Sequence, residues 1–288
     1  MSTTAYEVAV RAEAQLGEGP TWDADTGRLI WVDILGSRVH TYDPGDGRRT
    51  VMATGQHVGA AKPRAGGGLV VNLRDGIGLY GPGGAAFSWL VRDPVPGRRG
   101  NDAAVAPDGS LWAGTMRYDE APGGGGLTRV APDGTTADQG AGVGDVAVSN
   151  GTGWSPDGRL MYYVDSPTRR VDVLDFDGRT ARGRRPFAVI GEDGAGDPDG
   201  LTVDAEGCVW VALWNGGAVR RYTPDGRLDL TVDLPVPRPT ACAFGGPGLR
   251  DLYITTARVG QEHPHPLAGS VLVLPDAGQG MPGTAFAG

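Results

Sequence analysis

LTVDAEGCVWVALWNGGAVRRYTPDG, residues 201–226, contains a short apolar run, VWVALW from Val209, set between turns that contain glycine. The turn DAEGC precedes this run, and a second short run, AVRRYTPDG, follows it and ends in another turn. Short runs rich in β-branched and aromatic residues and bounded by turn residues are typical of β-hairpins. The stretch therefore predicts a strand, a turn, a second strand, a connection, a third strand and a turn.

The same unit recurs along the chain. Five further apolar runs match VWVALW, namely LIWVDI from Leu29, LVVNLR from Leu69, LWAGTM from Leu111, LMYYVDS from Leu160 and LYITTA from Leu252. The six starts are 40, 42, 49, 49 and 43 residues apart, which is the spacing of β-propeller blades. No segment between the strands keeps a 3.6-residue apolar period, which weighs against a parallel βαβ fold. We predict an all-β protein, a six-bladed β-propeller that forms a single domain over residues 1–288. The N-terminal stretch YEVAVRAEA could add an outer strand to the last blade and so close the ring.

Composition restricts the possible partners. The chain has 288 residues with 40% hydrophobic content and a net charge of −8, which disfavours nucleic acid and anionic lipid because like charges repel. The N-terminus lacks a basic segment followed by an apolar one, and no stretch is long enough to span a bilayer, so we expect no membrane partner and a cytoplasmic protein. The oligomeric state stays open, with a monomer or a weak homo-oligomer expected. Cys208 and Cys242 lie in apolar stretches and are expected to be buried thiols.

The hairpin turns provide a ruler for finding equivalent positions in different blades. Asp25, Asp108, Asp157 and Glu206 occupy equivalent turns, and the residues seven positions earlier are Glu18, Asn101, Asn150 and Asp199. The innermost strands of a propeller line its central channel, so equivalent positions near their starts converge on the axis. The matching positions of the other two units fall near Gly59 and Thr240, which are uncharged. The sequence thus predicts an asymmetric polar site on the axis.

Asp199 has a competing interpretation as a turn residue. Pro-Asp-Gly occurs five times, at 107, 132, 156, 198 and 224, and usually marks a turn. The copy at 198 is followed by LTVDAEGCVW, which contains its own hairpin turn, so Asp199 falls in the axial position. Taken singly, Asn150 and Glu18 also read as loop residues; the common register favours the axial interpretation.

Glu18, Asn150 and Asp199 form a set of oxygen donors that suits one hard divalent cation on the axis. Ca²⁺, Mg²⁺ or Mn²⁺ fit this set best, while Zn²⁺ and Fe²⁺ stay possible. Arg99 lies two residues before Asn101, which would place a cation at the channel mouth, although a surface arginine is the simpler alternative. Asp119 precedes the flexible stretch APGGGG and is either a residue of the cavity rim or an ordinary loop acid.

At these residues the chain resembles the senescence-marker-protein, gluconolactonase and regucalcin family, six-bladed propellers that bind one divalent metal and hydrolyse sugar lactones. LGEGPTWD, VSNGTGWSPDG and DPDGLTVDAEGCVWVALWNGG are similar to the family's metal motifs. The resemblance implies Glu18, Asn150 and Asp199 as metal ligands. It departs from the family at Thr152 and Gly153, between SNG and WS.

A further segment, RRGNDAAVAPDGSLWAGTM, resembles the family's substrate segment and implies that Arg99 and Asn101 contact the substrate. Asp119 falls where an acidic residue often does so, although some members carry Glu there. The motifs run from residue 17 to 217 and the ending GTAFAG is also family-like, so the resemblance covers nearly the whole chain.

Lactone hydrolysis needs an electrophile on the carbonyl oxygen, an activated water and a proton for the leaving hydroxyl. We expect a metal-dependent lactonase in which the metal polarises the carbonyl, Asp199 is both ligand and catalytic proton carrier, and Arg99 and Asn101 orient the sugar hydroxyls. The sequence contains no GxSxG motif for a covalent serine route. Two alternatives stay open: a phosphotriesterase-like or aryl-esterase-like metal hydrolase on the same propeller, and a non-catalytic calcium-binding protein like regucalcin.

Overall fold

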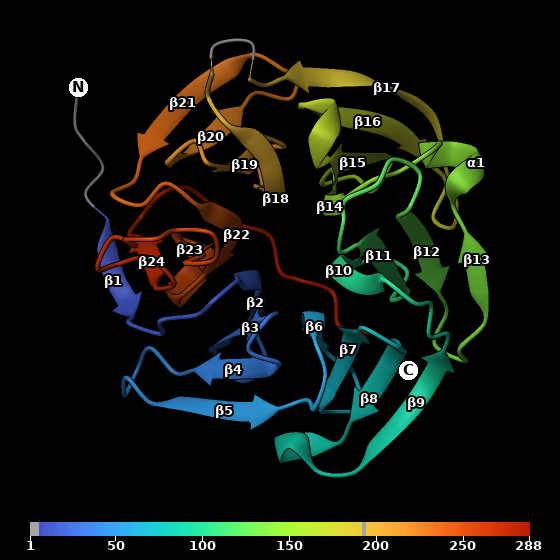
Figure 1. Cartoon of the computed structure of the whole chain (residues 1–288). Helices are drawn as coiled ribbons and strands as arrows, with labels where there is room; N and C mark the ends of the chain where they lie inside the picture. Colours follow the sequence, from blue (N-terminus) through green and yellow to red (C-terminus); the bar gives the residue numbers. More distant parts are fainter. Residues whose placement is uncertain (1–5, 192–193) are drawn as a thin grey trace.

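Six four-stranded antiparallel sheets surround a central axis in the computed structural model, which describes residues 6–191 and 194–288 (Figure 1). The first five residues, which formed part of the N-terminus discussed above, lie outside this range. The all-β, six-bladed propeller predicted from the spacing of the apolar runs is therefore confirmed.

Each blade is named here in chain order. Blade 1 contains β2 (Gly17–Asp23), β3 (Arg28–Asp33), β4 (Arg38–Tyr42) and β5 (Arg49–Ala53). Blade 2 contains β6 (Val58–Pro63), β7 (Leu69–Leu73), β8 (Gly76–Tyr80) and β9 (Phe87–Arg92). Blade 3 contains β10 (Arg98–Val105), β11 (Leu111–Arg117), β12 (Gly126–Val130) and β13 (Thr136–Asp138).

The remaining blades follow the same order, with one exchange at the ring closure. Blade 4 contains β14 (Ser149–Trp154), β15 (Leu160–Asp165), β16 (Arg170–Phe176) and β17 (Ala181–Val189). Blade 5 contains β18 (Asp197–Val203), β19 (Val209–Trp214), β20 (Ala218–Tyr222) and β21 (Leu228–Asp233). Blade 6 contains β22 (Pro239–Gly245), β23 (Asp251–Thr256) and β24 (Val271–Leu274), and its outer strand is β1 (Glu7–Val10).

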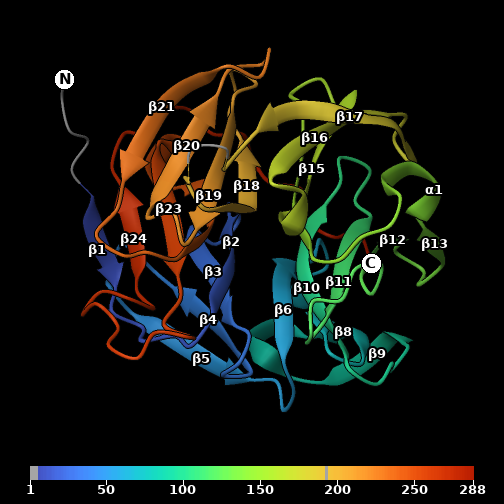
Figure 2. The ribbon, with the colours of Figure 1, turned by 45° about the horizontal axis from the view of Figure 1, so that its top comes forward.

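The pairing of β1 with β24 closes the ring, because the N-terminal strand completes the last blade. This confirms the role expected for YEVAVRAEA. The short helix α1 (Gly140–Val143) lies at the periphery and contacts β12 and β17 (Figure 2). Short 3₁₀ turns occur at Pro82–Gly84, Ser166–Thr168 and Pro247–Leu249. Within the described residues, no helix is both long and apolar enough to cross a bilayer.

The hydrophobic core is divided among the spaces between neighbouring blades. Each of the six large clusters of buried apolar side chains combines residues of two adjacent blades; one, for example, joins Trp112 of blade 3 to Met161 and Phe176 of blade 4. A blade has two apolar faces and buries each against a neighbour, so the ring is held together by this face-to-face packing. Cys208 and Cys242 are buried free thiols, as the sequence predicted.

The innermost strand of every blade departs from regular pairing near its start. The ladder shifts between Glu18 and Thr21 in β2, and corresponding shifts occur in β6, β10, β14, β18 and β22. In five of these strands the shift contains the position given by the seven-residue ruler, and in β2 it begins directly after that position, since Glu18 is still paired with Val32. A β-bulge leaves residues unpaired and redirects side chains, so the shift allows side chains at this end of the inner strands to face the axis.

Two glycines follow directly after axial residues and let neighbouring inner strands approach each other. A Cβ on Gly151 would lie 2.7 Å from the carbonyl oxygen of Asp199, and a Cβ on Gly200 would lie 2.3 Å from the Cβ of Ala241. Only glycine fits such close approaches. The sequences Asn150-Gly151 and Asp199-Gly200 therefore bring the axial side chains of blades 4, 5 and 6 close together.

The C-terminal segment crosses one face of the ring (Figure 1). Phe286 is completely buried between blades 2 and 3, and Gly280 bridges to Asp204. Residues 281–284 line a hollow at the ends of the inner strands, together with Pro20 and Val203. The starts of the inner strands face the opposite side of the ring, where the axial polar residues lie.

A candidate metal centre on the propeller axis

A cavity of about 400 Å³ opens at the starts of the inner strands. Its polar lining contains all four ruler residues together with Arg99; these are Glu18, Arg99, Asn101, Asn150 and Asp199. All five are buried, with exposed fractions of 5 or 6%. Residues separated by up to 181 positions in the sequence, from Glu18 to Asp199, thus share one site.

Two oxygen atoms in this cavity lack the partner that burial normally requires. The Oδ1 atoms of Asn150 and Asp199 are both buried, and neither has a hydrogen-bond donor among the described residues. The Asn150 amide nitrogen donates to Ser166 Oγ at 3.0 Å, which turns its oxygen away from that contact. Because an unsatisfied buried oxygen costs about 1–3 kcal/mol, the pair indicates a missing electropositive partner.

The carboxylates of the cavity show the same need for positive charge. Burial, and secondly the charge of Asp102, raises the pKa of Glu18 to about 8, against the opposing effects of the Gly19 N–H and the charges of Arg99 and Lys62. Burial, followed by the charges of Glu18 and Asp102, raises the pKa of Asp199 well above its ordinary value. A divalent cation between the two carboxylates would offset both effects. Glu18, Asn150 and Asp199 therefore fit one hard cation in number, donor type and burial.

Lys62 supplies a cation deeper in the channel. Its ammonium donates to Thr21 Oγ1 at 2.7 Å, and burial lowers its pKa while the charges of Asp102 and Glu18 oppose that change. Burial also raises the pKa of Asp102, and Lys62 is the main opposing charge. The channel near Glu18 therefore contains an acid, Asp102, and a buried base, Lys62, that influence each other's pKa.

Asn101 differs from Asn150 in what its side-chain oxygen contacts. Arg99 Nη1 donates to Asn101 Oδ1 at 2.6 Å and to the Gly100 carbonyl at 2.9 Å, while Asn101 Nδ2 donates to the Ser149 carbonyl at 2.9 Å. The oxygen of Asn101 is thus already engaged, whereas that of Asn150 is open. This difference separates a cation-binding amide from one that holds an arginine in place.

An aromatic side chain covers the Arg99 guanidinium. Arg99 Cζ lies 5.9 Å from the centre of the Tyr118 ring, and the Tyr118 hydroxyl is 2.7 Å from His57 Nδ1. A cation over an aromatic face is attracted by the ring quadrupole. Arg99 is therefore a buried, oriented donor, which excludes the surface-arginine alternative.

The acid of the neighbouring loop that lines the cavity is Glu120, one residue after the predicted Asp119. The Asp119 carboxylate accepts two hydrogen bonds from Arg117, at 2.8 and 2.7 Å, and its side chain is 57% exposed. Glu120 has a left-handed backbone, with φ of 54°, which turns its side chain to the other side of the loop. Of the two interpretations of Asp119, its ion pair with Arg117 favours the ordinary loop acid, and a contact between Asp119 and substrate stays a prediction.

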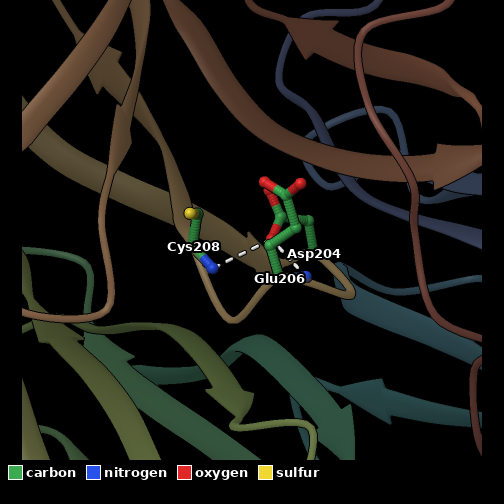
Figure 3. Close-up of side chains that lie close together, drawn as sticks. All are labelled: Asp204, Glu206 and Cys208. Atoms are coloured by element: carbon green, nitrogen blue, oxygen red, sulfur yellow. Dashed lines mark hydrogen bonds between the residues drawn. The ribbon is translucent and has the colours of Figure 1, made fainter.

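A second acidic group, formed by Asp204, Glu206 and Cys208, has donor atoms close enough to surround an ion (Figure 3). Its oxygens, however, already have partners. Asp204 Oδ1 accepts the backbone N–H groups of Glu206 and Cys208, and its Oδ2 accepts Trp210 Nε1 at 2.9 Å and Arg221 Nε at 3.0 Å. Arg221 also pairs with Glu206, and burial raises the pKa of the Cys208 thiol to about 11. A guanidinium already provides the positive charge in this group.

Several polar residues on or near the axis were not predicted from the sequence. Lys62, which lines the hollow on the opposite side of the ring, interrupts the apolar run VGAAKP, and an isolated charge in a strand of this kind was a usable signal. Trp214, Arg169 and Asp197 line the axial cavity. They lie at strand ends and loop positions that the seven-residue ruler does not reach.

Comparison with known proteins agrees with this geometry. The family model described as the SMP-30/gluconolactonase/LRE-like region matches residues 16–258. A 6-deoxy-6-sulfogluconolactonase from Pseudomonas putida is 38% identical over 86% of each chain. A pentonolactonase from Haloferax volcanii is 36% identical over 95% of each chain.

A solved structure is similar over nearly the whole fold. It is a calcium-binding regucalcin from Agrobacterium tumefaciens, with a TM-score of 0.92 and 30% identity over 98% of this chain and 97% of its own. The family match covers far more than half of the sequence and includes every axial residue described above. The chain is a member of the SMP-30/gluconolactonase/LRE-like family.

Proposed function

We propose that this protein is a metal-dependent hydrolase that opens a sugar lactone, an aldonolactone, to the corresponding sugar acid. The observation that carries the proposal is the pair of buried, unpartnered oxygens on Asn150 and Asp199 beside Glu18, in a cavity that also contains an oriented arginine. Two relatives named as sugar lactonases, at 38 and 36% identity, support the substrate class.

Glu18, Asn150 and Asp199 would hold the cation. Two carboxylates and one amide are donors that Ca²⁺, Mg²⁺ and Mn²⁺ prefer, and Zn²⁺ or Fe²⁺ also accept them. When bound, the cation supplies Lewis-acid polarisation of the lactone carbonyl oxygen.

The side chains around the cation site would perform the remaining tasks. Arg99 presents a fixed guanidinium toward the cavity, and Asn101 retains an amide N–H beyond the one given to Ser149, so both can orient sugar hydroxyls. Glu120 lines the same cavity and offers an acceptor for a further hydroxyl. Hydroxyl groups need both donors and acceptors, and these three side chains provide them.

Asp199 is the proposed proton carrier. Hydrolysis adds the oxygen of water to the carbonyl carbon, breaks the bond from that carbon to the ring oxygen, and moves one proton from the water to that ring oxygen. A carboxylate has two oxygens, so Asp199 can hold the cation through one oxygen and accept a proton at the other. Asp199 is therefore suited to take the proton from water and return it to the leaving hydroxyl.

A lactone panel on metal-stripped protein tests the proposal. Acid release from gluconolactone and a pentonolactone is measured before and after each of Ca²⁺, Mg²⁺, Mn²⁺, Zn²⁺ and Fe²⁺ is returned. We expect no release from the stripped protein and release after at least one addition. Full activity in the stripped protein would overturn the metal requirement, and a phosphotriester and an aryl ester in the same panel test the other hydrolase reactions.

A non-catalytic calcium-binding role is the second candidate. It is favoured by the close similarity to a calcium-binding regucalcin and by the all-oxygen donor set. Stoichiometric Ca²⁺ binding without turnover of any lactone would support this role over hydrolysis.

A further inference from the structure

Trp214 is the only aromatic side chain among the described residues that line the axial cavity. It is the last residue of β19 and pairs in register with Asp197, two residues before Asp199 in β18. The other lining residues are polar side chains or smaller apolar ones, so Trp214 provides the one flat aromatic surface of this described lining. No role for this indole follows from cation binding or proton transfer.

Arg238 braces the indole from one side. Its Cζ lies 4.8 Å from the centre of the Trp214 ring, the shortest such distance among the arginine–aromatic pairs of the described chain. The guanidinium is fixed in turn, since Nε donates to Asn215 Oδ1 at 2.7 Å and Nη1 donates to the Val259 carbonyl. Arg238 directly precedes β22, so blade 6 supports a ring that belongs to blade 5.

The loop after Trp214 is also restrained. Asn215 adopts a left-handed backbone with φ of 59°, and a Cβ on Gly216 would lie 1.9 Å from the Ala195 carbonyl oxygen. The backbone on either side of the turn is therefore tightly packed. An indole that is held by its own loop and by an arginine loses little further freedom when a ligand binds.

Trp214, held by Arg238 and by its own loop, forms a rigid aromatic surface beside the cavity, which we call the stacking wall. A sugar lactone has hydroxyls at its edges and less polar C–H groups on the faces of its ring, so it needs polar partners at one side and a flat apolar surface at the other. The cavity offers Arg99, Asn101 and Glu120 for the first need and Trp214 for the second. With Arg238 covering one face, the indole meets a ligand through its remaining face or edge.

We propose that Trp214 is the specificity-determining residue on which the sugar ring of the substrate stacks, and that Arg238 is the positioning residue that holds the indole in place. This inference rests on the proposed lactonase function, because it assigns a subsite of the same cavity. It predicts that the indole binds the ground state and the transition state equally, so its loss raises KM and leaves kcat nearly unchanged.

Kinetics on glucono-δ-lactone test the wall directly. Because aromatic stacking contributes about a factor of ten to affinity, W214L is expected to raise KM about tenfold and to change kcat by no more than about twofold. W214F keeps an aromatic ring and is expected to raise KM about threefold. W89L is the matched control: Trp89 also lies under an arginine, Arg92 at 5.7 Å, but belongs to the outer strand of blade 2. An unchanged KM in W214L, or an equal rise in W89L, would overturn the proposal.

The role of Arg238 is tested in a double-mutant cycle. R238Q is expected to raise KM about threefold in the wild-type background and to have no effect in the W214L background, because its action passes through the indole. An equal effect in both backgrounds would overturn the positioning role and indicate a general structural one.

Binding of gluconate, measured by calorimetry on the same proteins, separates failure of the wall from failure of the proposed reaction. Gluconate binding that weakens about tenfold in W214L supports the stacking wall even if no lactone is hydrolysed, in which case only the proposed function fails. Gluconate binding that is equal in both proteins, or absent from both, would overturn the stacking wall.

Discussion

Strand β18 has an acidic residue near its start and another directly after its end. Asp199 lies near the start and faces the axial cavity, while Asp204 follows the end and closes the turn on the opposite side of the ring. Both are buried, at 5 and 1% exposed. Each lies beside a second acid, Glu18 in the first case and Glu206 in the second.

The two acids differ in whether their oxygens have partners. Asp204 accepts two backbone N–H groups, the Trp210 indole and the Arg221 guanidinium. In the part of the chain that the structure describes, no donor reaches one buried oxygen of Asp199 or one of Asn150 beside it. Closeness of acidic side chains therefore does not define a metal site, whereas buried oxygens that lack a positively charged or donating partner indicate one.

The largest expected effect is a loss of catalytic activity when the acid at the axial end of β18 is replaced. D199N removes both a proposed ligand and the proposed proton carrier, so kcat/KM for gluconolactone should fall by about 10³-fold or more while the far-ultraviolet circular dichroism is unchanged. Comparable kinetics for D199N and the wild type would remove Asp199 from the mechanism.

The second prediction concerns stability at the other end. D204N removes the charge that pairs with Arg221 and weakens the bonds to Trp210 and the turn, so the free energy of unfolding should fall by about 2–4 kcal/mol. Urea denaturation measures this change. Metal binding by the folded fraction should persist, and its loss would show that the two ends are not independent.

The third prediction is a contribution to the pH dependence of stability that comes from Glu18 at the axial end of the propeller. The pKa of Glu18 is raised to about 8 in the folded protein, so without metal the folded state binds more protons than the unfolded state between the ordinary value of 4.5 and about pH 8. The free energy of unfolding of the metal-free protein should therefore decrease as pH rises through this window, and metal should restore it.

Denaturation at several pH values, with chelator or with Ca²⁺, provides the measurement. E18Q has no carboxyl to titrate at this position and should show a flatter profile in chelator. His40, whose pKa is lowered to about 4 chiefly by burial, contributes an opposite slope to both proteins, so the difference between them reports Glu18. Identical profiles for the wild type and E18Q in chelator would contradict the assignment of the raised pKa to the axial site.

The smallest expected effect is that of E206Q. The Glu206 side chain is 73% exposed and its partner Arg221 retains Asp204 and Asp229, so the free energy of unfolding should change by no more than about 0.5 kcal/mol. Thermal denaturation and metal titration should both resemble the wild type. A large loss of metal binding in E206Q would relocate the site to the Asp204 turn.

Repeat symmetry explains why much of the axial site was predictable from the sequence. The ruler works because six equivalent strands start at one end of the channel, and it placed Glu18, Asn101, Asn150 and Asp199 on a single cavity. It could not separate Asn101 from Asn150, because that difference depends on which amide oxygen Arg99 contacts.

The rim was harder to predict because its residues do not obey the repeat. In the loop after β11, Glu120 lines the cavity in place of Asp119, and Glu120 has a left-handed backbone. The spacing of residues in the sequence does not indicate such a backbone angle. Trp214 and Arg238 meet only because blades 5 and 6 are adjacent in the closed ring. Such contacts depend on the assembled fold and have no signature in either strand alone.

We propose that one divalent cation binds at the axial end of β18 and none at the Asp204 turn. Calorimetric titration of chelator-treated protein with Ca²⁺ and Mn²⁺ distinguishes the two ends, using the wild type, N150A, D199N and D204N. We predict one site per chain in the wild type and in D204N, and a loss of that site in D199N with a marked weakening in N150A. One retained site in D199N together with its loss in D204N would contradict the account.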